Sequence, residues 1–226
     1  SGNTYYTKYE KKDDVKTLTL PKEFIPLWNG AERSPEYKNA MRYLKRRDIT
    51  KREILKYGIG YCEEGLYRYR IIVPSYTNDG TLNYFVGRDY YGGGMKYKNP
   101  KISKDVVGFE SMIDWNQPVV LCEGVFDAIA IKRNAIPLFG KTLPPKLLQR
   151  LVQNKVKKVY LILDADAQKD SMKIVDKLKA YQINVNMIKL KDKDPSELGF
   201  EKTIDLIKQT NDSLSFSDIM KMKLGV

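Results

Sequence analysis

The stretch of sequence that decides the fold is residues 118–128, which read Pro-Val-Val-Leu-Cys-Glu-Gly-Val-Phe-Asp-Ala. Val119 to Cys122 is a short apolar run of the length expected for a buried strand. Gly124 allows the chain to turn sharply after that strand. Residues 127–132 are then predicted to be helical. A strand, a tight turn and a helix therefore follow one another directly, with Glu123 at the tip of the strand.

The same alternation continues downstream. Residues 159–163 and 185–190 are predicted strands, and residues 145–153, 171–181 and 201–209 are predicted helices. Short apolar strands separated by helices are typical of a mainly parallel sheet with helical crossovers. This part of the chain is therefore predicted to have an α/β fold, with helices flanking the sheet.

The sequence upstream has a different pattern. Residues 4–35 are basic and interrupted by prolines, so we expect irregular structure with short helices there. Residues 36–57 show apolar residues at helical spacing, interrupted near residues 48–50. This spacing predicts two short helices, the second with Thr50 as its N-cap and Glu53 completing a capping box.

A β-hairpin is predicted next. Residues 68–74 and 82–88 have strand composition and flank the turn sequence Asn78-Asp79-Gly80. The chain is thus expected to divide near residue 115. The predicted parts are a mixed α+β basic subdomain over residues 4–115, an α/β domain over residues 116–210, and a tail or short helix over residues 211–226.

Composition excludes several classes of protein. The 226 residues carry a net charge of +12, which favours a polyanionic partner, either nucleic acid or an anionic membrane surface, and charge alone does not choose between them. The chain has no histidine, which excludes a Ser-His-Asp triad and histidine-ligated zinc or haem. Two cysteines are too few for a disulfide scaffold and suit reduced cytosolic thiols. We expect no signal peptide and no membrane span, because no apolar stretch approaches about 18 residues.

Five carboxylates follow three of the predicted strands. Glu123 and Asp127 come after the first, Asp164 and Asp166 after the second, and Asp194 after the third. Because function collects at the carboxyl ends of parallel strands, we expect these side chains to share one edge of the sheet. Crowded carboxylates need cations, and oxygen-only ligands suit Mg²⁺ or Mn²⁺. The alternative is that each aspartate is a helix N-cap.

These motifs resemble the TOPRIM domain of bacterial-type primases, type IA and II topoisomerases and related nucleases. Within that superfamily, the resemblance to replicative DNA primases of bacteria and phages covers most of the chain. The similar segments of the α/β part are residues 121–128, 138–143, 163–166 and 193–197. Those of the N-terminal part are residues 42–49, 57–61, 86–88 and 96–100. The chain departs from the family pattern at Ala165, at Ala167-Gln168 and at Ser196, where Glu197 is the substitute acid.

The resemblance implies a primase catalytic core that makes short RNA primers by two-metal nucleotidyl transfer, with Mg²⁺ or Mn²⁺ as cofactor. Catalysis is assigned to Glu123, Asp164 and Asp166. The metal ligands are these three with Asp127 and Asp194, the nucleotide-binding residues are Arg88, Lys96, Asn99 and Lys104, and the template-binding residues are Arg42, Arg46, Arg47 and Lys141.

The implied partners are a single-stranded DNA template and ribonucleoside triphosphates. The other implied partners are a replicative helicase and a zinc-binding domain, and we expect the zinc-binding domain to be absent from this chain. The implied location is the cytoplasm of a bacterium or of a phage-infected host.

Two other functions share the acidic motif: a Mg²⁺-dependent TOPRIM nuclease and a non-catalytic nucleic-acid-binding TOPRIM module. A topoisomerase is disfavoured, since it needs a catalytic tyrosine on a separate domain and a longer chain. The basic helical faces have a simpler interpretation as solvated surface.

Overall fold

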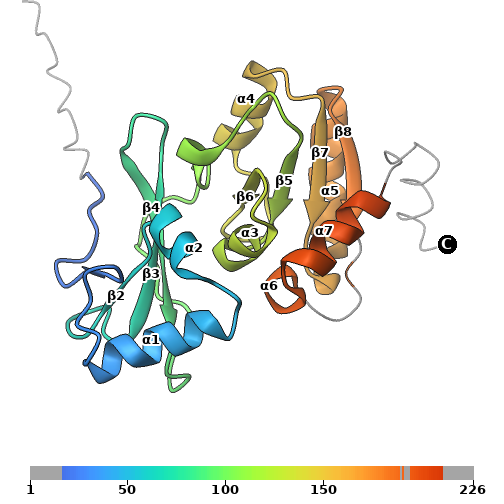
Figure 1. Ribbon diagram of the computed structural model, residues 1–226. Helices are drawn as coiled ribbons and strands as arrows, with labels where there is room; N and C mark the ends of the chain where they lie inside the picture. Colours follow the sequence, from blue (N-terminus) through green and yellow to red (C-terminus); the bar gives the residue numbers. More distant parts are fainter. Residues whose placement is uncertain (1–16, 189, 191–193, 211–226) are drawn as a thin grey trace, which may run out of the picture.

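The computed structural model describes residues 17–188, 190 and 194–210. Two four-stranded sheets lie side by side in it (Figure 1). The N-terminal half forms the antiparallel sheet, and the C-terminal half forms the parallel one. The tail expected over residues 211–226 lies outside the described residues. In the described part of the chain, no helix has both the length and the apolar character required to cross a membrane.

The antiparallel sheet has the strand order β1-β2-β3-β4. Its long strands, β3 (Arg70–Tyr76) and β4 (Leu82–Asp89), form the predicted hairpin, which is confirmed. The turn uses Gly80 at a φ of 81°, in the left-handed region that glycine adopts without steric cost. The two short strands, β1 (Ile25–Pro26) and β2 (Gly60–Cys62), extend the sheet beyond β3.

Two helices accompany this sheet, as the sequence predicted. They are α1 (Pro35–Lys45) and α2 (Lys51–Lys56). The capping box of α2 is confirmed, because Thr50 accepts a backbone hydrogen bond from the first turn while Glu53 reaches back to the Thr50 amide. The short helices expected within residues 4–35 are wrong for the described residues 17–34, which contain β1 and no helix.

The parallel sheet has the strand order β6-β5-β7-β8. Three of its strands, β5 (Val119–Cys122), β7 (Lys158–Ile162) and β8 (Asn184–Ile188), lie within a residue or two of their predicted positions. The edge strand β6 (Ala135–Pro137) was not predicted, since three residues carry no measurable periodicity. The parallel α/β architecture is confirmed.

Helices cover both faces of the parallel sheet. On one face, Val120 and Cys122 share an apolar cluster with Ile129 of α3 (Val125–Ile131). On the other, Leu121 packs with residues of α4 (Pro145–Gln153) and α5 (Gln168–Ala180). The helices α6 (Pro195–Leu198) and α7 (Phe200–Gln209) contact α3. Alternate residues of β5 thus face opposite layers, as strand geometry requires.

The two halves are joined by one continuous core. A single apolar cluster contains Leu44 of α1, Ile71 of β3 and Ile129 of α3, all fully buried. An ion pair of 3.2 Å between Lys132 Nζ and Glu53 Oε1 adds a polar contact beside this core. The N-terminal sheet is therefore packed firmly against the α3 side of the parallel sheet.

Candidate active site

The carboxyl ends of three parallel strands lie next to one another in the sheet register. The register pairs Cys122 of β5 with Ile162 of β7, and Ile162 with Ile188 of β8. The loops that carry Glu123 and Asp164 therefore begin at one edge of the sheet, where parallel α/β proteins place their sites.

The carboxylates at this edge interact electrostatically with one another. Burial raises the pKa of Glu123, and the negative charges of Asp164 and Asp166 raise it further. Burial also raises the pKa of Asp164, with added repulsion from Asp194 and Asp166. Lys96 and Lys141 act in the opposite direction on the pKa of both groups. Electrostatic effects thus link Glu123, Asp127, Asp164, Asp166 and Asp194, called the acidic cluster below, and Lys96 and Lys141 act on two of its members.

Asp127 is the most buried member of the acidic cluster, with 8% of its surface exposed. Its two oxygens accept backbone hydrogen bonds from Gly124 N at 3.1 Å and from Ser196 N at 3.3 Å. Burial, followed by the charge of Asp194, raises the pKa of Asp127 to about 7 despite these two donors. The Asp127 carboxyl is therefore rigidly held and sensitive to any added positive charge.

Asp166 lies at the exposed side of the cluster and pairs with Lys141. Lys141 Nζ and Asp166 Oδ2 are 2.8 Å apart, and this hydrogen bond lowers the pKa of Asp166 and raises that of Lys141. The side chain of Asp166 is 74% exposed, so the pair is open to exchange with solvent ions. Lys141, predicted on the template, thus lies within reach of the carboxylates.

Asp194 has the capping role considered as an alternative. It is the N-cap of α6, and its Oδ1 accepts hydrogen bonds from Glu197 N at 2.9 Å and from Ser196 Oγ at 2.7 Å. The capping residue of α3 is Gly124, with Asp127 at the third helical position. The N-cap interpretation therefore applies to Asp194 and not to Asp127.

The donor set fits a hard divalent cation. The cluster offers carboxylate oxygens alone, and Glu123 Oε2 is a buried acceptor with no hydrogen-bond donor among the described residues. Among those residues, no three His, Cys, Asp or Glu side chains converge on one point at ligand distance. Asp127, Asp166 and Asp194 each accept a hydrogen bond from a protein donor. A cation at this edge would therefore share these carboxylates with the protein donors that they already have.

The predicted nucleotide-binding residues lie around β4 and the loop that follows it. The Arg88 guanidinium packs over the rings of Tyr43 at 5.6 Å and Tyr97 at 4.7 Å, and its Nε has no partner among the described residues. Lys96 is exposed and close enough to Glu123 and Asp164 to act on both. Lys96 therefore lies near the acidic cluster, while the observed contacts of Arg88 are with the two tyrosine rings.

The other two predicted nucleotide-binding residues support the backbone. Asn99 Oδ1 accepts a hydrogen bond from Gly87 N at 3.3 Å, and Lys104 Nζ donates to Phe139 O at 2.8 Å. A Cβ atom at Gly87 would lie 2.4 Å from Lys98 O, so only glycine lets this loop approach β4 so closely. Asn99 and Lys104 thus position the segment that carries Lys96.

The predicted template-binding arginines belong to α1 and the residues directly after it. Arg42 and Arg46 are exposed, and Arg42 Nη1 donates to Asn39 Oδ1 at 2.8 Å. Arg47 instead reaches across to the other half of the chain, where its Nη1 donates to Ser196 Oγ at 2.6 Å. The sequence marked Ser196 as a departure from the family pattern but carried no signal for this partner.

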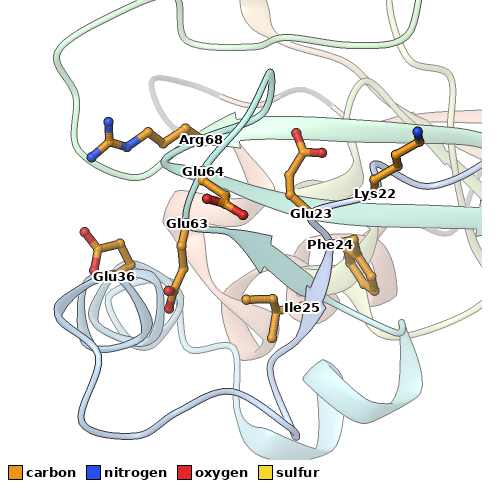
Figure 2. Close-up of a pocket in the computed structure, with 8 residues that line it drawn as sticks. All are labelled: Lys22, Glu23, Phe24, Ile25, Glu36, Glu63, Glu64 and Arg68. Atoms are coloured by element: carbon orange, nitrogen blue, oxygen red, sulfur yellow. The ribbon is translucent and has the colours of Figure 1, made fainter.

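Figure 2 shows a separate pocket of about 660 Å³, which the sequence did not predict. Four of its eight lining residues are glutamates, but three of these accept hydrogen bonds from the protein itself. Glu63 accepts from Ser34 and Tyr61, Glu36 accepts from Ser34, and Glu23 accepts from the backbone of Tyr67. The lining residues are Lys22, Glu23, Phe24, Ile25, Glu36, Glu63, Glu64 and Arg68, none of them in the acidic cluster.

Comparison with known proteins agrees with this description. Residues 120–198 match the model of the Toprim-like family. The chain is 31% identical over 166 residues to Uncharacterized protein MG010 of Mycoplasma genitalium, covering 68% of this chain and 75% of that protein. It is 28% identical over 180 residues to the MG010 homolog of Mycoplasma pneumoniae, covering 74% of this chain and 84% of the relative.

Solved structures show the same architecture. A DnaG primase catalytic domain bound to single-stranded DNA superposes with a TM-score of 0.71 at 17% identity, covering 85% of this chain and 77% of that one. A DNA primase domain from Pseudomonas aeruginosa gives a TM-score of 0.70 at 19% identity, covering 86% and 78%. The resemblance read from the motifs is thus confirmed in fold. The chain belongs to the family of the Mycoplasma genitalium protein MG010, and it combines a Toprim-like domain with the fold of a DnaG-type primase catalytic core.

Proposed function

We propose that this chain is a DNA primase catalytic core, which copies a single-stranded DNA template into short RNA primers. The observation that carries the proposal is the acidic cluster at the carboxyl edge of the parallel sheet, with Lys96 and Lys141 beside it. Nucleotidyl transfer demands this combination, because carboxylates hold divalent cations while cationic side chains hold the triphosphate. A replicative helicase and a zinc-binding domain as partners belong to the same proposal.

In this mechanism, Glu123, Asp164 and Asp166 would hold Mg²⁺ or Mn²⁺, with Asp127 and Asp194 completing the set. The cation supplies charge neutralisation at the reacting phosphate. Glu123 is suited to a direct contact because its buried Oε2 has no hydrogen-bond donor in the part of the chain that the structure describes. Asp166 can contribute once Lys141 moves from its carboxylate to a phosphate of the nucleotide.

The cationic side chains serve the nucleotide and the template. Arg88 is stacked between two tyrosines, which orients its guanidinium for a phosphate without a large entropic cost on binding. Lys96 is exposed and near Glu123 and Asp164, which suits it to contact the triphosphate. Arg42 and Arg46 are exposed on α1 and its C-terminal end, where they suit contacts to the sugar-phosphate backbone that do not read sequence.

The direct test is primer synthesis by the purified protein. A single-stranded template, Mg²⁺ and the four ribonucleotides, one of them labelled, should yield short RNA that disappears when the metal is chelated. Cleavage of the DNA without RNA product would identify a nuclease instead. Template binding with neither product would identify a non-catalytic binding module.

Template binding should depend steeply on salt. With about four phosphate contacts, the affinity for a single strand should fall about 50-fold between about 50 and about 200 mM salt, because each contact releases bound counterions. Fluorescence anisotropy with a labelled oligonucleotide measures this slope. A variant with Arg42 and Arg46 both changed to Gln should bind more weakly and show a shallower slope. A template affinity that does not change with salt would rule out the basic surface of α1 and α2 as the template-binding surface.

A further inference from the structure

The side chain of Arg47 connects the end of α1 to the acidic cluster. Arg47 lies two residues after the last residue of α1, and its Nη1 donates to Ser196 Oγ, 149 positions away in the sequence, at 2.6 Å. The guanidinium also packs over the rings of Tyr43 at 5.1 Å and Phe126 at 5.3 Å. Because one ring belongs to each half of the chain, the position of Arg47 is fixed by both.

Ser196 stands where two carboxylates of the cluster meet. Its hydroxyl donates to Asp194 Oδ1 at 2.7 Å, and its backbone N–H donates to Asp127 Oδ1 at 3.3 Å. Ser196 is only 8% exposed, so water does not compete readily for these bonds. A hydroxyl has one proton to give, and giving it to Asp194 turns a lone pair toward Arg47. The hydrogen bonds therefore run in one direction, from Arg47 through Ser196 to Asp194.

This direction has a consequence for the carboxylates. A donor as strong as a guanidinium polarises the hydroxyl that accepts from it, and the hydroxyl then donates more strongly. Asp194 and Asp127 carry like charges and would separate if each were free to rotate. Ser196, oriented by Arg47, holds one oxygen of each carboxylate, and the second oxygen of Asp127 is held by the Gly124 amide.

We propose that Arg47 is a positioning residue, which orients Asp194 and Asp127 for a divalent cation by fixing the Ser196 hydroxyl. This inference rests on the proposed function, since it assumes that the acidic cluster binds the catalytic metal. It differs from the sequence-based assignment of Arg47 to the template. Outer partners that orient ligating groups typically contribute about 10- to 100-fold to metal affinity, which makes the role measurable.

Mn²⁺ binding followed by electron paramagnetic resonance tests the inference without requiring turnover. Arg47→Gln and Ser196→Ala should each weaken Mn²⁺ affinity about tenfold. The double variant should bind Mn²⁺ with the same affinity as the single variant of lower affinity, because both changes break the same chain of hydrogen bonds. Arg46→Gln is the matched control, with an exposed neighbour of the same charge. It should leave Mn²⁺ affinity unchanged and reduce only the affinity for template.

The outcomes separate this inference from the proposed function. If the wild-type protein binds no Mn²⁺, both are overturned. If it binds Mn²⁺ but Arg47→Gln and Ser196→Ala bind it equally well, the inference alone is overturned. If Arg47→Gln lost template affinity while its Mn²⁺ affinity stayed unchanged, Arg47 would be a template-binding residue and the inference would be overturned. Ser196→Ala removes one hydroxyl and little volume, so it decides the question even where Arg47→Gln folds poorly, as thermal melting will show.

Discussion

Asp164→Asn should reduce primer synthesis by about three orders of magnitude, which corresponds to about 4 kcal/mol of lost transition-state stabilisation. Asp164 follows β7 at the common edge of the sheet and is coupled electrostatically to Asp194 and Asp166. Asparagine keeps the size of the side chain but removes the negative charge that would neutralise a divalent cation. The rate of labelled primer formation at saturating Mg²⁺ measures the effect.

Template binding by the same variant should be unchanged or slightly tighter, since a negative charge leaves the site while the basic surface stays intact. Asp170→Asn serves as the control, because Asp170 lies in the first turn of α5 and pairs with the exposed Lys173 at 3.2 Å. It should retain nearly full synthesis. Nearly full synthesis by Asp164→Asn would instead mean that the acidic cluster is structural, and the polymerase assignment would have to be withdrawn.

Leu121→Ala should lower the free energy of unfolding by about 3 to 4 kcal/mol. Leu121 is fully buried in β5, which is paired with strands on both sides and packed beneath α4 and α5. Removing its branched side chain leaves a cavity that these rigid elements cannot close. Urea denaturation measures the loss, and the melting temperature should fall by about 10 °C.

Val152→Ala is the matched control for this loss. Val152 lies on α4 with 39% of its surface exposed, so its truncation should change stability by less than about 0.5 kcal/mol.

Leu121 also lies two residues before Glu123 in the sequence. The same variant should therefore impair primer synthesis at temperatures where the sheet begins to loosen. A loss of stability below about 1 kcal/mol would contradict the central position of β5 in the core.

The helices and strands of the α/β part followed from local sequence. The helix Pro145–Gln153 was predicted at its observed bounds, because a proline at its first position and an apolar face are encoded within nine residues. The hairpin β3-β4 followed in the same way from its turn residues. By contrast, β6 (Ala135–Pro137) and the four-residue helix α6 are too short to show a period, and tertiary packing forms them.

The grouping of Glu123 with Asp164 was also predictable, since parallel strands end at one edge and each acid directly follows a strand. The partner that each side chain takes within the group was not. Lys141 lies on Asp166 and Arg47 on Ser196, although the sequence had assigned both cations to the template.

The sequence by itself thus determined the α/β class, three of the four parallel strands and the acids that follow them, because periodicity and turn chemistry act over a few residues. Only the tertiary structure decided which donor meets which carboxylate. Residues 47 and 196 are 149 positions apart, and their contact depends on how two sheets pack around a shared core. Hydrogen bonds form over about 3 Å, a distance that only the packed fold can set.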